Sequence, residues 1–161
     1  MLDRPARSTP FDETQLARII ADHGSREGAL LPILHDAMAE FGWIDDAMVP
    51  PIAEALNLSR AEVHGVLTFY HDFRRAPAGR TVVKLCAAEA CQAAGGRSLV
   101  GRAEERLGTP MGTTDGEGAV TLEPVYCLGL CSMAPAAMVD GRIHGRLTPE
   151  RLDAVLSEAV R

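Results

Sequence analysis

The chain has 161 residues, which is enough to bury a hydrophobic core without disulfide bonds. Apolar residues make up 47% of the chain, but no apolar run approaches the roughly 18–20 residues that span a bilayer, so we expect no membrane insertion. Sixteen Lys and Arg against 22 Asp and Glu give a formal net charge of −6. No basic cluster is interleaved with aromatic residues, which argues against a nucleic-acid partner.

The N-terminal residues lack the apolar segment of a secretory signal, so we expect a cytoplasmic protein whose thiols stay reduced. Residues 1–11 contain two prolines, a serine and a threonine with few apolar side chains. This composition predicts a mobile tail before the folded part.

Residues 12–72 are expected to form about four helices. Asp12 and Gln15 have capping-box spacing for the first helix, and Gly24 is a suitable end. Apolar residues recur at helical spacing in the segments that follow. The other three helices are expected over residues 29–41, over residues 44–56, and after the capping box Ser59-Arg60-Ala61-Glu62.

A basic, turn-rich segment at 74–80 separates these helices from a β-branched run. We therefore expect a helical docking domain over residues 12–79 and a second domain over residues 80–161. Its predicted elements are a strand at 81–85 that ends at Cys86, a helix at 98–107, strands at 120–122, 137–139 and 142–144, and a helix from the Thr148 cap to about residue 160. The fold class is α+β: a helical bundle followed by a small α/β domain.

Four cysteines, all in the second domain, carry the chemistry that the sequence predicts. They form two close pairs, a C-x4-C at Cys86 and Cys91 and a C-x3-C at Cys127 and Cys131. Four thiolates suit Zn²⁺ or an iron–sulfur cluster. Inert packing cysteines and a dithiol redox pair are alternatives, although such a redox pair normally has C-x-x-C spacing at the start of a helix.

The spacing favours a binuclear cluster over zinc. Structural zinc usually takes the tighter C-x2-C knuckle, whereas a wider [2Fe–2S] cluster tolerates longer loops and lets each loop ligate one iron. Gly129 and the pair Gly95-Gly96 lie beside the cysteines, where they either admit a close backbone approach or serve as turns. Histidines 35, 64, 71 and 144 have no ligand spacing, so we assign none to a metal.

A family resemblance is carried by several segments together. These are LLPILH at 30–35, EVHGVLTFY at 62–70, and the C-x4-C followed after 35 residues by the C-x3-C. Together they resemble the thioredoxin-like [2Fe–2S] ferredoxin family, which includes the 24-kDa subunit of respiratory complex I. The resemblance implies a thioredoxin-like second domain in which Cys86 and Cys91 ligate one iron and Cys127 and Cys131 the other.

Two segments around the cysteines resemble a narrower group. They are AEACQ at 88–92 and LEPVYCLG at 122–129, which are similar to the gamma subunit of cytosolic NAD-dependent formate dehydrogenases. A complex I subunit and the diaphorase part of an NAD-reducing hydrogenase remain alternatives. A zinc-stabilised structural adaptor is the alternative from another class.

No nucleotide-binding motif accompanies the cysteines. The chain has neither G-x-G-x-x-G nor a P-loop. We therefore expect one [2Fe–2S] cluster here, FMN and NAD on a partner subunit that contains FMN and Fe–S clusters, and no catalytic activity of the isolated chain.

Overall fold

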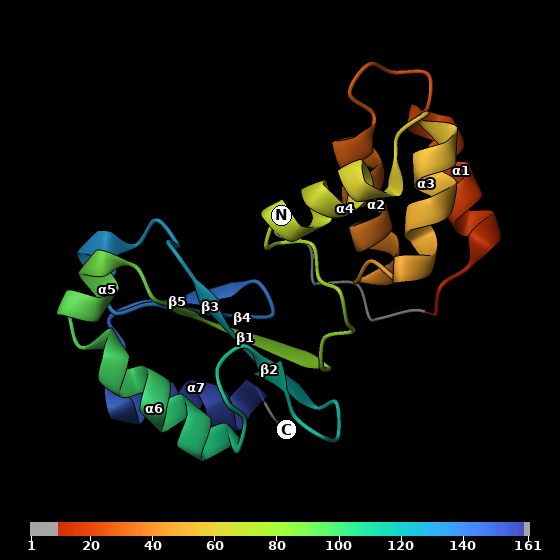
Figure 1. Ribbon diagram of the computed structural model, residues 1–161. Helices are drawn as coiled ribbons and strands as arrows, with labels where there is room; N and C mark the ends of the chain where they lie inside the picture. The colour runs from red at the N-terminus through yellow and green to blue at the C-terminus, as the bar shows by residue number, and fades with distance from the viewer. Residues whose placement is uncertain (1–9, 160–161) are drawn as a thin grey trace. The chain divides into compact units, whose positions relative to one another are not determined.

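The computed structural model describes residues 10–159, which divide into two compact units between Pro77 and Ala78 (Figure 1). The first unit is helical and the second is built on a sheet. Within the described residues, none of the helices has both the length and the apolar content that a bilayer span requires.

The helical unit has four α-helices and one short 3-10 helix among its described residues. They are α1 (Glu13–His23), α2 (Leu30–Phe41), η1 (Asp46–Met48), α3 (Val49–Ala55) and α4 (Arg60–Phe69). The prediction of about four helices is therefore confirmed.

Local capping explains where α1 and α4 begin. The Asp12 carboxylate accepts from the backbone N–H groups of Thr14 and Gln15, at 2.8 and 3.3 Å. Ser59 and Glu62 form the complete capping box expected at α4. The third helix begins later than predicted, because the Asp45 side chain first caps η1 and the two prolines occupy the start of α3.

The helical unit has its own hydrophobic core. Fully buried side chains such as Ile33, Leu34 and Ile52 form its centre. Phe11 packs edge-on against Phe41 at 6.2 Å between ring centroids, so the folded part includes the end of the predicted 1–11 tail. Residues 1–9 of that tail lie outside the described part of the chain.

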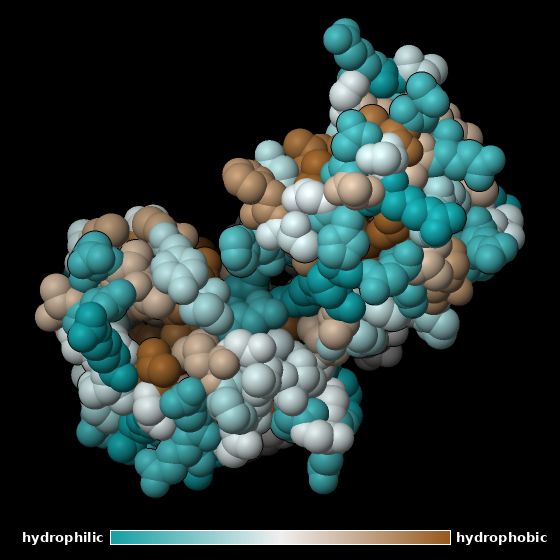
Figure 2. Space-filling view, viewed as in Figure 1, coloured by the Kyte–Doolittle hydropathy of each residue, from teal (hydrophilic) through white to brown (hydrophobic). Residues whose placement is uncertain are grey.

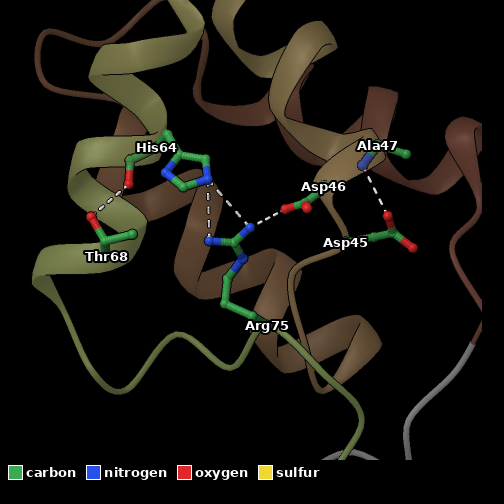
Figure 3. A network of polar contacts seen from close by, with 6 residues as sticks. All are labelled: Asp45, Asp46, Ala47, His64, Thr68 and Arg75. Atoms are coloured by element: carbon green, nitrogen blue, oxygen red, sulfur yellow. Dashed lines mark hydrogen bonds and ion pairs between the residues drawn. The ribbon is translucent and has the colours of Figure 1, made fainter.

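One polar network holds the segment after α4 against the helical unit. The Arg75 guanidinium forms an ion pair with Asp46 of η1 and lies 3.5 Å from Nε2 of His64 on α4 (Figure 3). Because these contacts join three segments, they fix the point at which the chain leaves the helical unit.

The second unit is a five-stranded sheet with three helices. Its elements are β1 (Thr81–Cys86), α5 (Glu89–Ala93), α6 (Gly96–Leu107), β2 (Thr113–Thr114), β3 (Val120–Val125), η2 (Cys131–Met133), β4 (Ala137–Val139), β5 (Arg142–His144) and α7 (Pro149–Ala159). The strand order is β2-β3-β1-β4-β5. β1 pairs parallel to β3 and antiparallel to β4.

Helices α6 and α7 pack side by side on one face of this sheet (Figure 1). Leu99 and Leu152 on the helices are buried against Val83 and Leu122 on the strands. The guanidinium of Arg102 on α6 donates two hydrogen bonds to the Asp153 carboxylate on α7. A separate core therefore supports the sheet that carries the cysteines.

The sequence predicted most of these elements but not all of them. The strands at 137–139 and 142–144 and the final helix are confirmed, whereas β3 runs three residues beyond its predicted end. The prediction missed α5 and β2. Both are short, and periodicity gives little signal over so few residues.

Candidate metal centre

The sheet topology brings both cysteine pairs to one edge. Cys86 is the last residue of β1, and its partner in the parallel β3 is Val125, two residues before Cys127. β3 and β4 flank β1 on opposite sides. The 126–136 connection between them, which contains Cys127 and Cys131, therefore crosses the end of β1 at Cys86.

The first pair is buried. The side chains of Cys86 and Cys91 are 6% and 3% exposed. Cys91 lies on α5, although the C-x4-C was expected in a loop. The Cys91 and Cys86 side chains lie within hydrogen-bonding reach of each other. Gly96 is needed here for a close approach, because a Cβ at this position would lie 2.6 Å from the Cys91 carbonyl oxygen.

The second pair is exposed. Cys127 follows β3 with φ of 151°, a backbone conformation that residues other than glycine rarely adopt, and Cys131 begins η2. The Gly129 N–H donates to the Cys127 sulfur at 3.3 Å. Gly129 has φ of 74° with open space at its Cβ position, so it serves as a turn that aims a backbone donor at a thiol.

A small apolar cluster surrounds the buried pair. Cys86, Cys91 and Ala136 form its centre, and Leu128 and Leu130 pack against it from the second cysteine loop. The Cys86 N–H donates to the Ala136 carbonyl at 3.0 Å. The two cysteine segments thus share one packing environment at the sheet edge.

Burial also changes the acidity of the site. It raises the pKa of the Cys91 thiol above its ordinary value of 9.0, and a hydrogen bond with the Cys86 side chain adds to the effect. Because metal ligation requires thiolates, binding of iron must release a proton from this residue.

The donor set fits a [2Fe–2S] cluster. Two pairs of thiols converge on one sheet edge, a backbone N–H points at one sulfur, and apolar side chains enclose the inner pair. Within residues 10–159, no three Cys, His, Asp or Glu side chains are grouped closely enough for a single metal ion.

Two of the described histidines take part in packing and polar contacts. His35 packs on Phe73 with 5.1 Å between ring centroids, and His64 takes part in the Arg75 network. A hollow of about 660 Å³ near β5 and α7 is lined by residues such as Asp140, Arg142 and Glu158, with no cysteine among them. The chemistry of the chain therefore concentrates on the cysteines.

Comparison with known proteins gives one consistent family. The thioredoxin-like [2Fe–2S] ferredoxin family matches residues 16–160. The chain is 39% identical over 119 residues to an NADH-quinone oxidoreductase subunit from Pseudomonas aeruginosa, covering 74% of this chain and 72% of the relative. It is 37% identical over 136 residues to the corresponding NADH-quinone oxidoreductase subunit from Rhizobium meliloti, covering 84% and 81%.

A solved structure extends this similarity to the fold. A chain of an air-oxidized NAD⁺-reducing [NiFe]-hydrogenase superposes with a TM-score of 0.67 at 25% identity. The match covers 81% of this chain but only 22% of the hydrogenase chain. The chain therefore belongs to the thioredoxin-like [2Fe–2S] ferredoxin family, and its second unit has the thioredoxin-like fold of that family.

Proposed function

We propose that this chain is an electron-transfer subunit that holds one [2Fe–2S] cluster on Cys86, Cys91, Cys127 and Cys131. The observation that carries the proposal is the crossing of the 126–136 segment over the end of β1, which joins two distant cysteine pairs. When bound, the cluster supplies reversible one-electron transfer.

The residues of the chain prepare the site for this role. Cys86 and Cys91 offer two thiols within the apolar cluster, and Cys127 and Cys131 offer two at the surface. The Gly129 N–H donates toward a sulfur and so stabilises negative charge on it. Backbone donation and solvent exposure are the means by which a protein adjusts the potential of such a site.

Iron and sulfide analysis of anaerobically purified protein tests the cluster directly. We expect red-brown protein with two irons and two sulfides per chain, and a new paramagnetic signal after reduction by one electron. Colourless protein that contains one zinc per chain would instead support the structural-adaptor alternative.

We further propose that the chain works within a cytoplasmic, NAD-linked complex and has no activity alone. NADH delivers two electrons as hydride, so a flavin must separate the pair before one-electron transfer. The chain has no G-x-G-x-x-G or P-loop, which supports placing FMN and NAD on a partner subunit. Names of the relatives, an NADH-quinone oxidoreductase subunit and an NAD⁺-reducing hydrogenase, support an NAD-linked parent.

For the parent complex, we propose an NAD-dependent formate dehydrogenase, in which this chain is the gamma subunit. The support is the sequence around the cysteines, AEACQ at 88–92 and LEPVYCLG at 122–129. A complex I subunit and a hydrogenase diaphorase subunit are the competing assignments. Purification of the native complex, followed by NAD⁺ reduction with formate or with hydrogen and NADH oxidation with a quinone, distinguishes all three.

The helical unit, within the 12–79 domain, is proposed to dock the chain onto the flavin subunit. Among its described residues are eleven Asp and Glu against five Arg, a formal charge of −6, and it contains no cysteine. Phe69 at the end of α4 is 73% exposed, and Tyr70 lies beside it. Figure 2 shows apolar side chains gathered over this part of the unit. An exposed aromatic residue on a unit of net negative charge suits a protein partner with a basic surface.

A further inference from the structure

The two cysteine pairs differ in their access to solvent. Cys86 and Cys91 are 6% and 3% exposed, whereas Cys127 and Cys131 are both exposed. The four thiols are chemically alike, so burial and local structure set the order in which they react with or bind another molecule.

The segment that bears the exposed pair also covers the buried pair. Leu128 and Leu130, which lie between Cys127 and Cys131 in sequence, pack against the Cys86–Cys91 cluster. Ala134 and Ala136, further along the same connection, complete that contact. A bulky molecule that reaches the inner thiols must therefore first displace the 126–136 segment.

The loop that bears the exposed pair, residues 127–131, is also suited to local movement. Cys127 and Gly129 both have positive φ, and the backbone around Cys131 forms only a 3-10 turn. By contrast, Cys86 is held in β1, and Cys91 is held in α5 beneath Gly96. Residues 126–130 lie outside the helices and strands, and segments without such regular hydrogen bonding are the ones that open locally at low cost.

We infer that the cluster enters and leaves the protein through the exposed pair, so that Cys127 and Cys131 ligate first during loading and release first during loss. This inference rests on the proposed cluster function. The partner is a donor whose [2Fe–2S] cluster is held by exchangeable thiolates. At each exchange a cysteine thiolate replaces a donor thiolate on iron, and the proton of the entering thiol passes to the departing thiolate. No electrons are transferred.

Pulsed alkylation during cluster loss tests the order of release. Cluster-loaded protein is treated with an iron chelator, labelled briefly with iodoacetamide at intervals, and analysed by mass spectrometry. We expect Cys127 and Cys131 to be labelled at least about tenfold earlier than Cys86 and Cys91. Denatured protein, in which all four thiols are accessible, is the control. Labelling of the inner pair first, or of all four together, would overturn the inference.

Loading of apoprotein tests the order of entry. A glutathione-bound [2Fe–2S] cluster is the donor, and the first donor-dependent change in visible circular dichroism is the readout. Cys127→Ser and Cys131→Ser should slow this phase at least about tenfold, whereas Cys86→Ser and Cys91→Ser should change it less than about twofold. The four variants are matched in chemistry, and far-ultraviolet circular dichroism checks their folding. Equal slowing by all four would overturn the inference.

The two proposals fail in different ways. Absence of iron and sulfide from anaerobically purified protein contradicts the cluster function itself. A normal cluster with the opposite labelling order contradicts only the entry route. The labelling experiment uses the unmodified chain, so it remains decisive if a serine variant does not fold.

Discussion

The two units of this protein differ in charge and in the side chains that they bring together, although they contain similar numbers of residues. The helical unit is strongly acidic and has a single apolar core, whereas the sheet unit places four cysteines around the end of one strand. Their buried clusters are separate. If the proposed function is right, recognition and redox chemistry are divided between the units, and the variants below test whether each can be perturbed without the other.

Removal of a proposed ligand gives the largest expected difference between the units. Cys91→Ala or Cys127→Ala should abolish most of the visible cluster absorbance and destabilise the sheet unit, because ligand binding contributes to folding energy. The helical unit should keep its helix content. Iron analysis and circular dichroism measure both effects. Ser132→Ala, an exposed neighbour of Cys131, is the control, and a cluster with unaltered spectra in either cysteine variant would exclude that ligand.

A cavity introduced into either core should destabilise mainly the unit that contains it. Leu34→Ala and Leu122→Ala each remove a fully buried side chain, and each should lower the free energy of unfolding of its own unit by about 2–5 kcal/mol. Urea unfolding followed by helix circular dichroism and by cluster absorbance separates the two responses. Leu34→Ala should shift mainly the first signal and Leu122→Ala mainly the second. Coincident transitions in both variants would show that the units unfold as one.

Truncation of the exposed aromatic residue tests the recognition role. Phe69→Ala in the full chain should weaken binding to the flavin subunit by about 2 kcal/mol, since exposed aromatics are common binding hot spots. Cluster content should not change. Ile143→Ala, which also truncates an exposed apolar residue but in the sheet unit, is the matched control. Calorimetric titration measures both, and equal affinities for the two variants would argue against docking through α4.

The smallest expected effect is a difference in acid sensitivity. Hydrogen bonds from the Ser59 backbone and side chain lower the pKa of the Glu62 carboxyl below its ordinary value of 4.5. Arg102 likewise lowers the pKa of the Asp153 carboxyl. A carboxyl with a lowered folded-state pKa stabilises fully above its ordinary pKa, and that contribution is lost as the pH falls through the folded-state value.

Matched amide variants separate these two acid responses. Glu62→Gln should reduce the loss of stability of the helical unit between about pH 5 and pH 3, and Asp153→Asn should do the same for the sheet unit. Unfolding midpoints at several pH values measure the effect. Each variant serves as the control for the other, and an unchanged pH dependence in both would mean that neither carboxyl contributes to acid sensitivity.

Comparison of the expected and observed elements shows which structural features depend on local sequence. The caps at Asp12 and Ser59 and the helix end at Gly24 were readable because capping depends on residues a few positions apart. Helix α5 was missed because its five residues give no periodic pattern. Aromatic residues at the end of an amphipathic helix usually join the core, and only the structure shows that Phe69 is exposed.

The sequence by itself determined the class of chemistry. Four cysteines in two close pairs restrict the choice of metal, and their spacing can be read directly from the sequence. It also determined the helix caps and the strand before Cys86. Only the tertiary structure decided that β3 and β4 flank β1, which carries the second pair across the end of the first strand. It alone decided that one pair is buried and the other exposed, since burial depends on residues that are distant in sequence and meet only in the folded sheet.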